Sequence, residues 1–224
     1  MPEDMRLFDI LGPVMIGPSS SHTAGAARIG RITRRLLGEE IVSADVLLTG
    51  SFAATYTGHG TDRAIIGGLM DMNVDDMRLR ESPTLAKNAG VDITFRTGEL
   101  PDAHPNTAQI TATGVSGQTI CVTAASIGGG RIRVEAIDGL PLSFTGEKNT
   151  YIVWHQDVPG MVALVSTMLA TKAVNIATMN VSRLAQGGQA VMVIEVDAAD
   201  PADNPKSLSV LPGVSRAVYL HKLD

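Results

Sequence analysis

Several hydroxyl side chains and one histidine lie close together near the start of the chain, where they could bind an anion and carry protons. Ser19, Ser20 and Ser21 precede His22 and Thr23, directly before a stretch with helical periodicity. A helix N-terminus offers unpaired backbone N–H groups and the positive end of the helix dipole, which together favour a small carboxylate. Capping the helix would need only one of these residues, Ser21 or Thr23, so we expect the turn to hold a ligand as well.

Two glycine-containing motifs resemble nucleotide-binding sequences but lack a required residue. Gly12 and Gly17 have the spacing of a P-loop, but Pro18 stands where the phosphate-binding lysine belongs. The run Gly58-His59-Gly60-Thr61-Asp62 begins like a dinucleotide fingerprint, yet Arg63 replaces its third glycine. We therefore exclude nucleotide binding through either motif.

The remaining candidates for proton transfer are His59 and His104. The glycines on either side of His59 allow a ligand close to the backbone and leave the imidazole accessible at the start of a predicted helix over 62–72, which suits a general base. The alternative is a loop histidine without a task. His104 precedes Pro105 and Asn106, an extended segment at the entry to a predicted strand.

The other histidines and the cysteine carry no such signal. His155 and His221 have no companions that indicate catalysis, so we expect them on the surface. Cys121 is the one cysteine of the chain and is expected to be a buried structural thiol. One thiol excludes internal disulfides, cysteine-rich zinc sites and a self-contained iron–sulfur cluster. We expect this chain to ligate no metal.

Composition excludes two classes of partner. The net charge is −5 and no run of Lys or Arg exceeds two residues, which argues against nucleic acid. The longest apolar runs are about five residues, far short of a membrane span. The acidic first residues lack the features of a signal peptide, so a cytoplasmic location is expected.

The periodicity predicts an α+β fold with a boundary after residue 147. In residues 1–147, helices over 24–37 and 62–72 are expected to pack on an antiparallel sheet formed mainly from residue 91 onward. In residues 148–224 the order β-α-β-β-α-β is that of a ferredoxin-like domain.

The motifs together resemble one family, the beta subunit of bacterial iron–sulfur L-serine dehydratase. The resemblance is carried by five segments and covers nearly the whole chain: Leu7-Phe8-Asp9-Ile10, the run from Gly17 to Gly25, Gly58 to Asp62, His104-Pro105-Asn106-Thr107, and Ser126-Ile127-Gly128-Gly129-Gly130. Residues 148–224 resemble an ACT regulatory domain.

The resemblance implies conversion of L-serine to pyruvate and ammonia with a [4Fe–4S] cluster carried by a separate alpha chain. It implies that His59 is the leading catalytic base and that His22 and His104 orient substrate or relay protons. The substrate-binding residues that it implies are Ser19, Ser20, Ser21, Thr23, Gly60, Thr61 and Asn106.

The ACT resemblance implies amino-acid binding at Gly160, Asn175 and Ile176 and pairing of two such domains in a dimer. A different class of function remains open. The first half also resembles the serine-sensing intervening domain of some phosphoglycerate dehydrogenases, so the alternative is a non-catalytic amino-acid-sensing module.

Overall fold

The chain forms two compact units, each with its own helices and strands. The structure is a computed structural model that describes residues 14–55, 58–197 and 205–223. The units are Met1–Glu135 and Ala136–Asp224. Both contain helices and largely antiparallel sheets, which confirms the α+β class.

The first unit contains helices and one mixed sheet. Its elements are η1 (Ser20–Gly25), α2 (Ala26–Leu37), β1 (Ile41–Leu48), α3 (Gly50–Thr55), α4 (Thr61–Leu69), η2 (Met77–Glu81), α5 (Ser82–Asn88), β2 (Asp92–Thr97), β3 (Thr107–Gly114), β4 (Thr119–Gly128) and β5 (Arg131–Ile137), which continues into the second unit. The strands follow the order β2-β1-β3-β4-β5.

The sheet is not wholly antiparallel, contrary to the expectation from sequence. β1 pairs parallel with β2 and antiparallel with β3. The segment between β1 and β2 holds α3, α4, η2 and α5, which is long enough for the crossover that parallel strands require.

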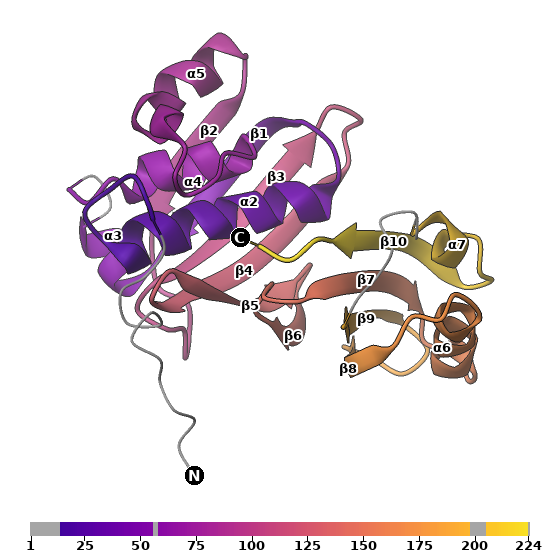
Figure 1. Cartoon of the computed structure of the whole chain (residues 1–224). Coiled ribbons are helices and arrows are strands. Elements are labelled where there is room, and N and C mark those ends of the chain that lie inside the picture. The colour runs from indigo at the N-terminus through magenta and orange to yellow at the C-terminus, as the bar shows by residue number, and fades with distance from the viewer. Residues whose placement is uncertain (1–13, 56–57, 198–204, 224) are drawn as a thin grey trace. The chain divides into compact units, whose positions relative to one another are not determined.

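Helices α2 and α4 lie side by side on one face of this sheet (Figure 1). A side chain added at Gly30 would come within 2.3 Å of the Ile65 carbonyl oxygen, and one at Gly68 within 2.0 Å of the Ala27 carbonyl oxygen. The two helices therefore approach so closely that only glycine fits at these crossing points. Their contact fixes the start of α2 relative to the start of α4, where the predicted site residues lie.

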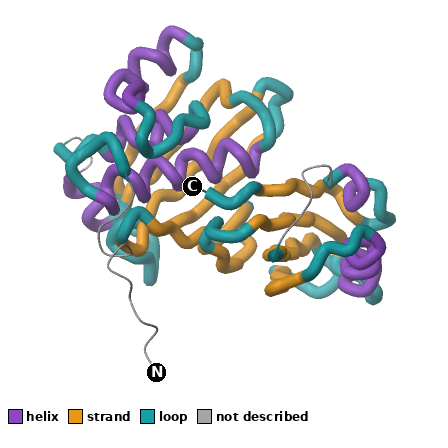
Figure 2. Tube along the Cα trace, viewed as in Figure 1, coloured by secondary structure: helices purple, strands orange, loops and turns teal. Residues whose placement is uncertain are grey.

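The second unit contains a four-stranded antiparallel sheet with two helices. After β6 (Leu140–Phe144) the elements are β7 (Asn149–Gln156), α6 (Met161–Thr171), β8 (Ile176–Arg183), β9 (Gln189–Val196), α7 (Lys206–Ser209) and β10 (Val214–Leu220). The strand order is β10-β7-β9-β8 (Figure 1). Figure 2, viewed as in Figure 1, shows the strands in orange and the helices in purple. Met161, Val165 and Leu169 of α6 and Leu208 of α7 share one apolar core with the strands.

Two sequence expectations about single residues are wrong. His155 is only 2% exposed and lies on β7, the strand that pairs with β10 on one side and β9 on the other. Cys121 is only partly buried. Ile120 and Val122 face the core, and alternation along β4 points Cys121 to the opposite face.

Two kinds of feature are absent from the described part of the chain. None of its helices has the length and apolar character needed to cross a bilayer. Within the same residues, no group of three His, Cys, Asp or Glu side chains is placed to hold a metal ion. The segment Leu7–Ile10, which carries part of the family resemblance, and Gly12 of the P-loop-like spacing lie outside the described residues.

Candidate functional site

The hydroxyl-rich turn folds into a π-helical turn, η1, that runs directly into α2. Ser19 caps it, since its Oγ accepts a hydrogen bond from the backbone N–H of His22 at 3.2 Å. The cap is thus Ser19, and the expectation of Ser21 or Thr23 is wrong. Ser20 is the first residue of η1, and Thr23 lies in its buried half. Single π-helical turns are frequent at functional sites, because the wider turn redirects side chains.

Three serines hold the imidazole of His22. Its Nδ1 lies 3.1 Å from Ser21 Oγ and 3.4 Å from Ser19 Oγ, and its Nε2 lies 3.1 Å from Ser51 Oγ. Burial lowers the pKa of His22, and charge on the nearby His59 lowers it further, against the opposing effect of a hydrogen bond with Ser51. Contacts at both ring nitrogens therefore fix the orientation of the His22 imidazole, and its lowered pKa favours the neutral form.

Ser51 reaches His22 because the chain turns sharply at the end of β1. Gly50 has φ of +52°, and a side chain there would lie 2.6 Å from the carbonyl oxygen of Pro105. That oxygen accepts a hydrogen bond from the Ser51 N–H at 2.7 Å. Glycine is thus needed for both conformation and space. The contact ties the loop that contains His104 to the residue that holds His22.

The loop around His104 is internally ordered. His104 Nδ1 accepts a hydrogen bond from the Asn106 N–H at 3.1 Å, and the Asn106 carbonyl oxygen accepts one from Ser126 N–H at 2.9 Å. Among the described residues, no hydrogen bond or ring contact joins His104 to His22 or His59. The fold thus brings the His104 loop to the site's margin and does not bring the imidazole into contact with the other two.

His59 is placed differently from His22. Its ring centroid lies 5.2 Å from that of His22, and its side chain is exposed. Gly60, in the left-handed conformation with φ of +69°, starts α4 immediately after it. No hydrogen bond to the His59 imidazole is found within the described residues. His59 is the histidine whose ring nitrogens remain available to a ligand.

A pocket of about 610 Å³ opens beside His59 and the first turn of α4. Thr23, His59 and Gly60, among the predicted residues, line it. Thr23, which lines the pocket, and Thr61, the first residue of α4 and outside the lining, are 4% and 0% exposed, and neither hydroxyl has a hydrogen-bond partner in the described structure. The first amides of α4 also point out of the helix without helical acceptors. Buried donors of this kind suit a carboxylate.

The predicted regulatory residues lie in the second unit. Gly160 has φ of +90° and begins α6, with open space around its Cα. The Asn175 side-chain amide donates to Asp197 Oδ2 at 2.6 Å, and Ile176 is the first residue of β8. The Gly187 N–H and Arg183 guanidinium hold the pKa of Asp157, which precedes this turn, below its usual range.

Sequence reasoning missed three residues at the site. Ser51 hydrogen-bonds His22, and Arg63 and Arg80 line the pocket. The Gly50-Ser51 pair, which follows the apolar run Val46-Leu47-Leu48 after one residue, is the signal that would have indicated Ser51. In the sequence, Arg63 indicates only that the motif around His59 is not a dinucleotide fingerprint, and no local pattern marks Arg80.

Comparison with known proteins places the chain in a family. The family model of the serine dehydratase beta chain matches residues 6–90. A "Probable L-serine dehydratase, beta chain" of Bacillus subtilis (strain 168) is 46% identical over 208 residues, which cover 93% of this chain and 94% of that protein. The chain belongs to the serine dehydratase beta chain family.

Two further relatives differ in kind. The "L-serine dehydratase, beta chain" of Peptoniphilus asaccharolyticus is 36% identical over 195 residues, 87% of this chain and 88% of that protein. A "D-3-phosphoglycerate dehydrogenase" of Bacillus subtilis (strain 168) is 25% identical over 190 residues, 84% of this chain but 36% of that protein. The predicted resemblance to a serine dehydratase beta subunit is thereby confirmed.

Proposed function

We propose that this serine dehydratase beta chain acts with a separate alpha chain to convert L-serine to pyruvate and ammonia. The observation that carries the proposal is the pairing of His22 and His59, with ring centroids 5.2 Å apart, beside a pocket lined by His59 and by Thr23, whose buried hydroxyl has no partner in the described structure. An amino-acid dehydratase needs proton carriers beside hydrogen-bond donors that can bind the substrate carboxylate, and this pocket has both.

The substrate carboxylate is bound at the start of α4. The hydroxyl groups of Thr23 and Thr61 donate to it, together with the amides that follow Gly60. Their burial makes this favourable, because each donor lacks a partner in the described structure and so gains a hydrogen bond on binding. Ser19, Ser20, Ser21 and Asn106 complete the proposed contacts.

His59 removes the proton from the serine Cα, and the β-hydroxyl leaves as the Cα–Cβ double bond forms. The Cα–H electron pair becomes the new π bond, and the departing hydroxide takes the proton that His59 removed and leaves as water, which returns His59 to its neutral form. The aminoacrylate then tautomerises to an imine, which water hydrolyses to pyruvate and ammonia. His22 stays neutral and, held by Ser19, Ser21 and Ser51, orients the site beside His59. His104 orients substrate from the margin.

The residues of this chain do not fit the role of cluster ligands. A [4Fe–4S] cluster is held by several cysteine thiolates, whereas the chain has only Cys121, which lies on β4. We therefore place the cluster on the alpha chain. When bound it would supply a Lewis acid that polarises the serine hydroxyl.

Anaerobic co-expression with an alpha chain tests the proposal. The complex should make pyruvate from L-serine, and the purified beta chain alone should make none. His59→Asn should abolish turnover without loss of assembly, whereas His221→Asn, at an exposed histidine of the second unit, should leave turnover intact. Pyruvate formation by the beta chain alone, or failure to associate with the alpha chain, would contradict the proposal.

The similarity to phosphoglycerate dehydrogenases supports a second candidate function, a non-catalytic amino-acid-sensing module. In that case the same pocket would bind L-serine without turning it over. Calorimetry of the beta chain with L-serine, together with the turnover assay, separates the two. Tight binding by the chain alone, with no pyruvate in the presence of an alpha chain, would favour the sensor.

The second unit is proposed to be an ACT regulatory domain. Its element order, β7-α6-β8-β9-α7-β10, and strand order, β10-β7-β9-β8, support this assignment. Gly160, Asn175 and Ile176 would bind an amino-acid ligand, since the amides at the start of α6 can receive a carboxylate.

The same unit offers an edge for dimer formation. β8 is an edge strand with mostly exposed residues, and Val181 and Leu184 are 46% and 71% exposed. Exposed strand edges pair readily with another chain. Analytical ultracentrifugation of wild type and Val181→Lys tests this. A wild-type monomer at micromolar concentration would contradict dimer formation.

A further inference from the structure

We infer that Arg63 and Arg80 form a cationic rim on the active-site pocket that binds an acidic surface of the alpha chain. The inference rests on the proposed function, because it places a surface of the alpha chain against the same pocket. Both side chains line the pocket, and both residues are exposed.

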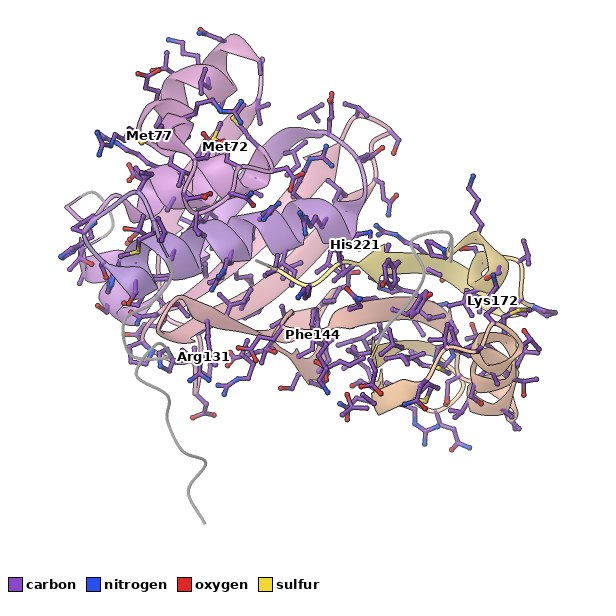
Figure 3. The ribbon with its side chains drawn as sticks, in the orientation of Figure 1. Met72, Met77, Arg131, Phe144, Lys172 and His221 are labelled. Carbon is purple, nitrogen blue, oxygen red and sulfur yellow. The ribbon has the colours of Figure 1, made fainter. Side chains whose placement is uncertain are left out.

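The fold brings these two arginines together from separate segments. Arg63 lies in the first turn of α4, and its carbonyl oxygen accepts a hydrogen bond from Ser82 Oγ at 2.6 Å. Ser82 is fully buried and follows η2, the short helix that carries Arg80. Met77, labelled in Figure 3, marks the start of η2. The hydrogen bond therefore ties the two arginines to one side of the pocket.

Neither guanidinium is neutralised within the described chain. No ion pair or side-chain hydrogen bond joins Arg63 or Arg80 to an acidic group there, and no acidic residue lines the pocket. Other arginines of the same unit are paired: Arg31 and Arg35 contact Asp71, and Arg78 contacts Asp76. The pocket rim therefore has two positive charges without an acidic partner in the described part of the chain.

The pocket is larger than the proposed substrate. The roughly seven non-hydrogen atoms of L-serine fill only part of the 610 Å³ pocket, whose volume lies in the range of about 300–1,000 Å³ that is typical of sites for larger ligands. The buried hydroxyls and the amides of α4 already provide for one carboxylate. The remaining volume and both arginines are thus left for a second occupant, which must bring negative charge to offset the cost of burying two guanidinium groups. Carboxylates suit these planar groups because they pair with them through two hydrogen bonds.

The test compares the affinity of full-length beta chains for the purified cluster-bearing alpha chain under anaerobic conditions. Arg63→Ala/Arg80→Ala should weaken binding by about tenfold or more and flatten its dependence on salt. Arg80→Ala alone should weaken binding as well, and Arg78→Ala is its matched control, since it removes one positive charge from the same short helix, η2, but from an arginine that Asp76 already pairs. The control should bind as wild type does.

Charge-retaining and charge-reversing variants exclude a folding artefact. Arg63→Lys/Arg80→Lys should recover part of the affinity, and Arg63→Glu/Arg80→Glu should bind more weakly than the alanine pair. Unchanged affinity with a raised KM for L-serine would overturn the inference and assign the arginines to the substrate. Unchanged affinity and unchanged KM would also overturn it. A wild-type chain that binds no alpha chain would instead overturn the proposed function itself.

Discussion

The contact between Gly25 and Ser126 holds the hydroxyl-rich turn against the sheet and allows a quantitative test. A methyl group at Gly25 would lie 2.1 Å from Ser126 Oγ and 2.7 Å from its Cβ, but 3.7 Å from its Cα. Gly25 has φ of −61°, so its backbone accepts alanine without strain. We therefore expect Gly25→Ala to cost about 1–3 kcal/mol of unfolding free energy from overpacking alone, partly offset by about 0.5–1 kcal/mol of helix propensity.

Replacing Ser126 by glycine should relieve the overlap, whereas Ser126→Ala should not, because its Cβ still lies within 2.7 Å of the added methyl. The cycle of Gly25→Ala, Ser126→Gly and the double variant should thus show a favourable coupling of about 1–3 kcal/mol. Urea unfolding followed by far-UV circular dichroism, with hydrogen exchange in α2 and β4, measures it. A coupling below about 0.5 kcal/mol would refute the packing argument.

Three further predictions concern the histidines and the turn that supports them. His59→Ala should raise the pKa of His22, because it removes a nearby positive charge; an imidazole titration by NMR that shows no rise would contradict this. Because His22 has a folded-state pKa below the 6.5 of the unfolded chain, the unfolded state takes up its proton first, so the unfolding free energy should fall as pH drops through 6.5 toward the lower value. His22→Gln should flatten that slope in urea titrations at several pH values. Gly50→Ala should destabilise by about 2–5 kcal/mol from left-handed backbone and overlap together, and Gly117→Ala, at φ of +83° in open space, by only about 1–2 kcal/mol; equal losses would contradict the close contact at Gly50.

Local sequence signals predicted most of the elements and part of the site. Periodicity located α2 and α4 to within a few residues and predicted the element order of the second unit, because each element buries one face at a regular spacing. It missed α5 and the parallel pairing of β1 with β2, because short helices bury too few residues to show a period and strand partners depend on the whole sheet. The expectation that His155 lies on the surface was wrong because the burial of a strand residue also depends on the whole sheet.

The site itself shows where local reasoning ends. Ser19 and Ser21 contact His22 from within its own turn, so a single motif contains them. Ser51 and His59 reach the same imidazole from two other segments, across sequence separations that only the packing of α2 on α4 and of α3 on β3 can close. The differing roles of the two histidines follow from that packing. His22 is surrounded by hydroxyls and lowered in pKa, whereas His59 faces the pocket, and a base must keep a ring nitrogen available to the substrate.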